Sequence, residues 1–154
     1  MRSLSIPDSA APRTQDCNCL ALRQAARHIT QHYDQYLSPT GLRSTQFSIL
    51  ARLNRIGPLT INELAAELVM DRTTLGRNVL PLQRDGLIAI ETSAQDRRRK
   101  ELRLTDAGSR RLTGAVDAWV AAQESFEAAF GKRKAGDLRS LLGAVVSTTL
   151  QAAS

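Results

Sequence analysis

Guanidinium, hydroxyl and amide side chains are concentrated at two places in the middle of the chain. Residues 71–78 read Asp-Arg-Thr-Thr-Leu-Gly-Arg-Asn, and residues 95–100 read Gln-Asp-Arg-Arg-Arg-Lys, the most basic run in the sequence. Such groups bind phosphate oxygens and hydrogen-bond to base edges, so both places are expected to contact double-stranded DNA. The residues expected to make these contacts are Arg72, Thr73, Thr74, Arg77, Asn78, Arg97, Arg98, Arg99 and Lys100.

Two short helices joined by a sharp turn are predicted around the first of these places. Thr60-x-x-Glu63 has the form of a capping box, and the helix that it opens runs to Leu68. Asp71 then stands where a second helix, continuing to about Asp85, needs an N-cap. Free amides and the positive end of the helix dipole favour phosphate there, while the nearby side chains can reach base edges.

Helical spacing separates an inner from an outer face on this second helix. Leu75, Val79 and Leu82 are expected to point inward. Gly76 leaves one side bare, which would let the duplex backbone or a neighbouring helix come close. Pro81 has no amide proton to donate, so we expect it to bend the helix and begin the turn into the next element.

Two short apolar strands, Leu87–Ile90 and Leu102–Leu104, enclose the second basic place and predict a hairpin with a cationic tip. Two helices at a sharp turn, followed by such a hairpin, describe a winged helix-turn-helix. This shape places a helix in the major groove of DNA and a basic loop, the wing, beside it.

One carboxylate lies among the arginines of the wing. Asp96 is expected to pair with Arg98 and stabilise the tip, which leaves Arg97 or Arg99 to enter the minor groove. The sequence does not decide which arginine enters the groove. The competing interpretation is a charge run that only keeps the surface soluble.

Apolar helices precede this core. The first is expected from Asp16 to Leu37 and ends at Pro39. The next is expected to be capped by Ser44 or Thr45 and to stop at Gly57. Its predicted inward face consists of Phe47, Leu50, Leu53 and Ile56.

Two further apolar helices follow the core. A helix of about 25 residues is expected after the cap at Thr105, and at about 37 Å it outreaches so small a domain. Gly131 separates it from a last helix. That helix is marked by Leu138, Leu141, Leu142, Val145 and Leu150. The simplest way to bury the outer helices is against a second copy, as a two-fold dimer.

The predicted fold class is therefore mainly α with a small β-hairpin wing. Residues 1–15 are expected to form a mobile arm without a signal-peptide pattern. Residues 16–37 together with 106–152 form the helical dimerisation region, and residues 43–105 form the winged helix-turn-helix domain.

Composition fits a nucleic-acid-binding protein of one domain with an appendage. The 154 residues carry a net charge of +6, and 42% of them are hydrophobic. A basic balance favours polyanionic partners. The sequence has no apolar run long enough to span a bilayer, and its two cysteines imply no disulfide framework, so we expect a cytoplasmic protein.

The chain resembles the MarR (multiple antibiotic resistance regulator) family of bacterial transcription factors. The resemblance is carried by residues 60–68, by Asp-Arg-Thr-Thr-Leu at 71–75, by Leu-x-x-Asp-Gly-Leu-Ile at 82–88, and by the pattern from Asp96 to Gly108. It implies a homodimeric repressor or activator that releases DNA when a small aromatic anion binds or a cysteine is oxidised. It also assigns wing function to the arginine of Asp-x-Arg, which is Arg98.

The two cysteines leave a redox alternative open. Cys19, near Cys17 at the start of the first helix, is similar in position to the reactive cysteine of the hydroperoxide-sensing branch, and Tyr33 falls where a tyrosine supports the thiolate. Arg23 replaces a second tyrosine of that branch, although one turn from Cys19 it could itself lower the thiol pKa. The alternative is that the cysteines are small apolar residues.

Two histidines lie at positions 28 and 32, a spacing that can hold zinc. No third ligand from the same subunit completes such a site, so neither a metal nor another cofactor is expected. His28 and His32, with Arg27 and Tyr33, are instead expected to meet an anionic effector. The sequence shows no nucleophile, base or phosphate loop at motif spacing, so an enzyme is not expected.

Taken together, these patterns predict a dimeric, sequence-specific transcriptional regulator, most simply a repressor, that binds a pseudo-palindromic operator and is released by a small aromatic or anionic ligand. Three rivals remain. One is a redox-sensing regulator that uses Cys19. The others are a non-specific architectural DNA-binding protein and a winged helix used only for protein–protein contacts.

Overall fold

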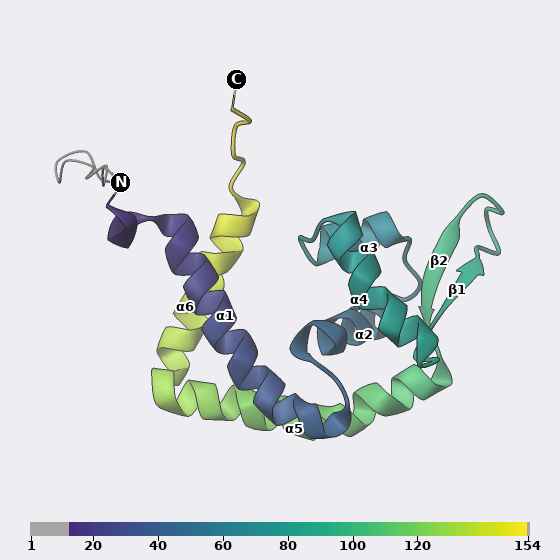
Figure 1. Cartoon of the computed structure of the whole chain (residues 1–154), viewed down its shortest axis with the longest axis horizontal. Coiled ribbons are helices and arrows are strands. Elements are labelled where there is room, and N and C mark those ends of the chain that lie inside the picture. The colour runs from purple at the N-terminus through teal and green to yellow at the C-terminus, as the bar shows by residue number, and fades with distance from the viewer. Residues whose placement is uncertain (1–12, 154) are drawn as a thin grey trace, which may run out of the picture.

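A computed structural model describes residues 13–153 of the chain. Helix α5 runs along the base of the molecule, with α1 and α6 towards one end and α2–α4 and the hairpin towards the other (Figure 1). The elements are η1 (Thr14–Asp16), α1 (Asn18–Leu37), η2 (Ser38–Thr40), α2 (Ser44–Ile56), α3 (Ile61–Glu67), α4 (Arg72–Arg84), β1 (Ile88–Thr92), β2 (Lys100–Leu104), α5 (Asp106–Phe130) and α6 (Lys132–Ser147). The predicted fold class, mainly α with a β-hairpin wing, is confirmed. The expected arm, residues 1–15, lies largely outside the described residues.

One hydrophobic core joins the end of α1 to α2, α3, α4, the hairpin and α5. Each of its largest side chains is less than 2% exposed, and removing such a side chain from water stabilises the fold by about 1.5–3 kcal/mol. These side chains are Leu37, Ile49, Leu50, Leu64, Leu75, Leu82 and Ile88. The core therefore packs the two helices of the helix-turn-helix against the base of the wing.

The base of the wing is also tied down through its backbone. Strands β1 and β2 pair antiparallel, with Ile88 opposite Leu104 and Thr92 opposite Lys100. Leu59, just before α3, exchanges two backbone hydrogen bonds with Leu102, at 3.2 and 2.7 Å. The strands reach further towards the tip than predicted, so Lys100 lies in β2.

Most predicted helix ends are confirmed. Thr60 and Glu63 form the reciprocal capping box. The Thr60 nitrogen lies 2.8 Å from the Glu63 carboxylate, and the Glu63 nitrogen lies 3.2 Å from the Thr60 hydroxyl oxygen. Asp71 caps α4, and Thr105 caps α5. Val69 turns the chain between α3 and α4 with φ +50°, a left-handed conformation that is rare for a β-branched residue.

Three predictions about helix boundaries and faces are wrong. The N-cap of α2 is Arg43, because the Arg43 amide is satisfied by Gln46 and the Ser44 amide by Asp34 from α1. Ile56, expected on the buried face of α2, is 45% exposed in its last turn. Leu150 lies beyond α6, which ends at Ser147.

Apolar side chains remain exposed on the outer helices. On α6, Leu141 is 67% and Val146 is 63% exposed, and on α1 Leu22 is 39% exposed. No helix in the described part of the chain is both long and apolar enough to cross a membrane. Much of the exposed apolar surface therefore lies on the helices that the sequence assigned to dimerisation, although Val69 and Leu80 in the helix-turn-helix are also exposed.

Candidate nucleic-acid interface

Helix α4 presents a polar outer face because its inner face is fully used by the core. Leu75 and Val79 are at most 3% exposed. Thr73 and Arg77 lie one turn apart on the opposite side of the helix, and both are exposed. Arg72, at the first helical position, is also exposed. These three side chains are available to a groove at the N-terminal half of α4.

Two residues predicted to contact DNA also make hydrogen bonds within the first turns of α4. The Thr74 hydroxyl donates to Asp71 at 2.5 Å and the Thr74 amide donates to the same carboxylate at 2.8 Å. Asn78 donates its side-chain amide to the Thr74 carbonyl at 2.9 Å. The hydrogen bond from the Thr74 hydroxyl, followed by that from its amide, lowers the pKa of Asp71 below its usual value. The cap is therefore ionised at neutral pH and fixes the direction of the first turn.

Gly76 and Pro81 shape the outer side of α4. A Cβ placed on Gly76 would meet no atom within 4 Å, so nothing in the described protomer fills the space beside it. Pro81 lies inside the helix, which continues to Arg84, and its ring removes the donor that the Arg77 carbonyl would otherwise have. The expected bend at Pro81 stays a prediction.

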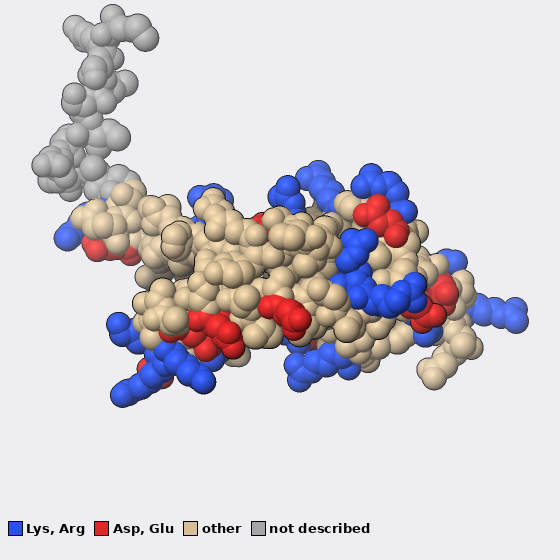
Figure 2. Space-filling model, turned by 90° about the horizontal axis from the view of Figure 1, so that it is seen from below, with Lys and Arg blue, Asp and Glu red and all other residues tan. Residues whose placement is uncertain are grey.

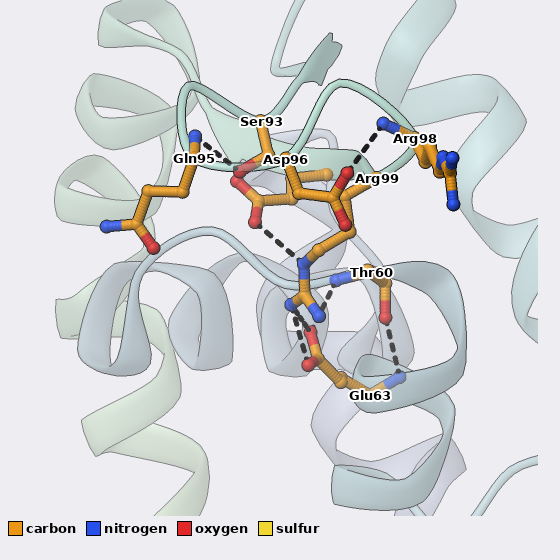
Figure 3. A network of polar contacts seen from close by, with 8 residues as sticks. Thr60, Glu63, Ser93, Gln95, Asp96, Arg98 and Arg99 are labelled. Carbon is orange, nitrogen blue, oxygen red and sulfur yellow. Dashed lines mark hydrogen bonds and ion pairs between the residues drawn. The ribbon is translucent and has the colours of Figure 1, made fainter.

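The wing tip is organised by its own backbone and by Asp96. The amide of Ser93 donates to the Arg99 carbonyl at 2.9 Å, and the Arg99 amide donates to the Asp96 carbonyl at 3.0 Å. The Asp96 side chain accepts from the Arg98 backbone amide at 2.9 Å (Figure 3). The predicted pairing of Asp96 with the Arg98 guanidinium is thus corrected, since the carboxylate binds the main chain and the guanidinium points away.

The four basic residues of the tip differ in what they already bind. The Arg99 guanidinium is held by Glu63 and Glu101, at 2.7 and 3.2 Å, and Lys100 donates to Thr92 at 2.9 Å. Among the described residues, neither Arg97 nor Arg98 takes part in an ion pair, and both are exposed. The arrangement therefore leaves Arg97 and Arg98, rather than Arg99, for contact with a polyanion.

Basic side chains are unevenly distributed over the molecule. In Figure 2, which shows the α5 side of the molecule, several separate groups of Lys and Arg side chains lie over the half that carries α2–α4 and the hairpin, with Asp and Glu side chains among them. Another group projects near the other end. The positive potential around such groups of basic side chains attracts polyanions and raises their rate of association.

The candidate sensor residues on α1 are separated from one another. Cys17 caps α1 by accepting the Leu20 amide at 3.4 Å, and Cys17 and Cys19 are both exposed free thiols. Cys19 and Tyr33 lie about 21 Å apart along the same helix. Tyr33 therefore cannot support the Cys19 thiolate within one subunit.

Tyr33 takes part instead in a polar chain that joins three helices. Its hydroxyl donates to Gln123 on α5, Gln123 donates to Glu127, and Arg139 on α6 donates to the same Glu127 oxygen at 3.2 Å. Burial, followed by the negative charge of Glu127, raises the pKa of the Tyr33 hydroxyl above its usual value. This chain holds α1 and α6 to α5.

The four residues predicted to bind an effector differ in their surroundings. Arg27 and His28 are exposed on α1, whereas His32 packs towards α5 with Nε2 3.0 Å from the Ala122 carbonyl. The described residues contain no cluster of three side chains that could hold a metal ion.

An open hollow of about 240 Å³ lies elsewhere, between α2 and α5. The Phe47 and Trp119 rings stack at 5.9 Å on one side of it, and Arg52 and Arg55 provide positive charge. Its lining consists of Phe47, Ser48, Ala51, Arg52, Arg55 and Trp119. The sequence did not lead us to expect this hollow. The repeat of positions 48, 51, 52 and 55 along one side of α2 was the signal that could have found it.

Comparisons with known proteins agree with this architecture. Residues 40–99 match the model of the MarR family. The chain is 33% identical over 84 residues to an HTH-type transcriptional regulator, YwoH, of Bacillus subtilis. That alignment covers 54% of this chain and 61% of YwoH, so the chain matches about three fifths of its length.

Solved structures match over nearly the whole chain. The transcriptional regulator MosR of M. tuberculosis, determined in complex with DNA, is 39% identical with a TM-score of 0.73, covering 88% of this chain and 100% of MosR. A probable transcriptional regulator from Pseudomonas aeruginosa is 28% identical with a TM-score of 0.77, covering 86% and 99% of the two chains. Because these relatives are transcriptional regulators, they agree with the prediction that the chain is not an enzyme. With its helix-turn-helix, its wing and these relatives, the chain belongs to the MarR family of DNA-binding transcriptional regulators.

Proposed function

We propose that the protein is a dimeric, sequence-specific repressor that places α4 of each subunit in a major groove and the wing tip in the adjacent minor groove. The observation that carries this proposal is that exposed side chains able to contact DNA lie beside carboxylates that hold the backbone in place. Thr73, Arg77 and Arg98 are exposed, and the neighbouring Asp71 and Asp96 are used to fix the backbone that presents them. That MosR, which is 39% identical, has been solved in complex with DNA supports DNA binding by this chain.

The proposed contacts follow from which side chains are free. Arg77, with Thr73 beside it, reads base edges, because a guanidinium donates two parallel hydrogen bonds to guanine. Arg72 and the amides at the start of α4 bind phosphate. Arg98, with Arg97 as its neighbour, enters the minor groove. Thr74 and Asn78 support these contacts by holding the helix start.

Dimerisation is proposed from the apolar surface that the protomer leaves exposed. Leu141, Val145 and Val146 on α6 are 49–67% exposed. Covering this surface with the same surface of a second copy gives a two-fold dimer. The two α4 helices then meet half-sites about one helical turn, roughly 34–36 Å, apart on a pseudo-palindrome.

Replacing Arg98 with alanine is expected to weaken binding to all duplexes similarly, because a minor-groove or phosphate contact carries little sequence information. The plot of log affinity against log salt concentration should lose about one unit of slope per subunit. Fluorescence anisotropy over a range of salt concentrations measures both quantities.

Ala94→Ser, which changes an exposed residue of the same tip without changing charge, is the matched control. An unchanged slope and affinity in Arg98→Ala would contradict a DNA contact at the wing.

We further propose that the effector is a small aromatic carboxylate that binds the hollow between α2 and α5. The stacked Phe47 and Trp119 rings offer an apolar wall, and Arg52 offers a cation. Arg52 also lies 3.8 Å from Glu67 on α3. An anion that draws Arg52 away from Glu67 would loosen the first helix of the helix-turn-helix and shift the dimer towards a DNA-free spacing.

Arg52→Ala is therefore expected to bind DNA and to require about tenfold more aromatic carboxylate for release, since one charge-assisted contact is lost. Release of labelled operator by a set of benzoates measures this. Arg27→Ala is the matched control, because it removes an arginine from the alternative site on α1. Loss of the response in Arg27→Ala alone would move the effector to Arg27, His28, His32 and Tyr33.

The redox alternative is tested in the same assay. It is favoured by the exposure of both thiols at the start of α1. If an organic hydroperoxide releases the wild-type protein from the operator but does not release Cys19→Ser, then Cys19 is the sensor. Equal behaviour of the two proteins would exclude that role.

A further inference from the structure

Glu63 has a position that serves two elements at once. It lies in the first turn of α3, where its carboxylate accepts the Thr60 amide at 2.8 Å and closes the capping box. Both oxygens of the same carboxylate also accept from Nη2 of Arg99, at 2.7 and 2.8 Å (Figure 3). The two residues are far apart in sequence, so this contact joins the start of the helix-turn-helix to the tip of the wing.

The Arg99 guanidinium is held by two carboxylates, through Nε and through Nη2. Its Nε donates to Glu101 on β2 at 3.2 Å, and the Glu101 side chain is only 16% exposed. Its backbone amide and carbonyl close the tip through Asp96 and Ser93. The hydrogen bonds that Arg99 donates to Glu63, followed by the one that it donates to Glu101, raise the pKa of the Arg99 guanidinium further above its ordinary value. A phosphate would therefore have to compete with two carboxylates for the Nε and Nη2 hydrogens of Arg99.

The remaining hydrogen bonds that involve side chains of the tip stay within the hairpin. The backbone amide of Gln95 donates to the Ser93 hydroxyl, the backbone amide of Arg98 donates to the Asp96 carboxylate, and the Lys100 ammonium donates to the Thr92 hydroxyl. Within residues 13–153, the Arg99–Glu63 pair is the one side-chain hydrogen bond or ion pair that links residues 93–100 to another element. The base of the wing is buried, but its tip is held to α3 by this pair.

We propose that Arg99 is a positioning residue, which latches the wing tip to α3 through Glu63 so that Arg97 and Arg98 are held at a fixed distance from α4. The inference rests on the proposed DNA binding, and it assigns one arginine of the basic run to the protein and not to DNA. A two-oxygen contact to a single guanidinium is suited to this task because it fixes orientation as well as distance.

The change in DNA affinity caused by Glu63→Gln has opposite signs for a latch and for a direct contact between Arg99 and DNA. If Arg99 bound DNA, Glu63 would be only a nearby negative charge, and Glu63→Gln would tighten binding by removing repulsion. If the pair is a latch, Glu63→Gln weakens binding, because the wing tip loses its fixed position. Glutamine still accepts the Thr60 amide, so the capping box is retained.

The test compares Glu63→Gln, Arg99→Ala and the double variant in binding to a duplex selected by the wild-type protein. Each single variant is expected to bind roughly three- to thirtyfold more weakly over the two subunits, as expected for a half-exposed ion pair. The double variant should be no weaker than the worse single variant, because both changes break one contact. The salt slope should stay that of the wild type, unlike the slope of Arg98→Ala.

A second readout needs no DNA. Hydrogen exchange of the Ser93 and Arg99 amides should become faster in both single variants, while amides of α5 keep their rates. Faster exchange in the wing supports the latch even if the wild type binds no duplex, an outcome that would sink the proposed function alone. Tighter binding by Glu63→Gln, a lower salt slope in Arg99→Ala, or unchanged exchange in the wing would overturn the latch.

Discussion

An Arg77→Ala variant is expected to lose most of the preference of the protein for its operator. A bidentate contact to guanine discriminates by about 1–3 kcal/mol, and a dimer makes this contact twice. The affinity for the operator should therefore fall by about thirtyfold to about twenty-thousandfold, while binding to random duplex falls far less. Competition binding with both duplexes at one salt concentration measures the two affinities together.

Arg84→Ala is the matched control for this prediction. Arg84 carries the same charge on the same helix, is 77% exposed, and lies at the end of α4 beside Asp85. Its removal should lower both affinities by a similar small factor or leave them unchanged. If Arg84→Ala and Arg77→Ala reduce the preference equally, Arg77 does not read the sequence.

Leu141→Asp is expected to convert the dimer into a monomer and to weaken operator binding by two to four orders of magnitude. The charge would be placed in the apolar surface proposed to pair with a second copy, where an unpaired carboxylate is costly. Without the dimer, the second half-site no longer benefits from a high effective concentration. Light scattering gives the oligomeric state, and anisotropy gives the affinity.

Arg133→Glu provides the comparison, since it adds a carboxylate to the same helix at a side chain that is 96% exposed. This variant should stay dimeric. A Leu141→Asp protein that remains a dimer with unchanged affinity would show that α6 is not the interface.

Local signals in the sequence were sufficient for most of the fold. Caps such as Asp71 and Thr105 act within one turn, and inward residues such as Leu75 and Val79 follow the helical period, so both can be predicted from neighbours. The cap of α2 could not be, because the Ser44 amide is satisfied by Asp34 from another helix. Tertiary contacts of this kind override local preference.

The sequence showed which residues form the basic surface, but it did not show what each of these residues binds. The basic run at residues 95–100 indicated a wing, yet nothing near Arg99 in the sequence reveals that its partner is Glu63 on α3. Likewise, Tyr33 resembled a thiolate partner by position, whereas the fold gives it Gln123 on α5. Pairings between distant segments depend on packing, which no motif records.

The hollow between α2 and α5 illustrates the same limit. Phe47 was predicted on the inward face of its helix and is buried there, whereas Trp119 lies on α5 and is partly exposed. Their stacking beside Arg52 arises only when the two helices cross. The residues proposed to control DNA binding are therefore harder to predict from the sequence than the residues proposed to bind DNA.

The central claim is that α4 and the wing form a sequence-specific reader. It is tested most directly by selecting bound duplexes from a random pool and then measuring affinity for the best selected duplex and for a scrambled version at physiological salt. We expect the selected duplexes to share a pseudo-palindrome with half-sites about one helical turn apart, and we expect a preference for it of about a thousandfold or more. Selection of no common sequence, with equal affinity for both duplexes, would contradict the central claim and indicate an architectural DNA-binding protein.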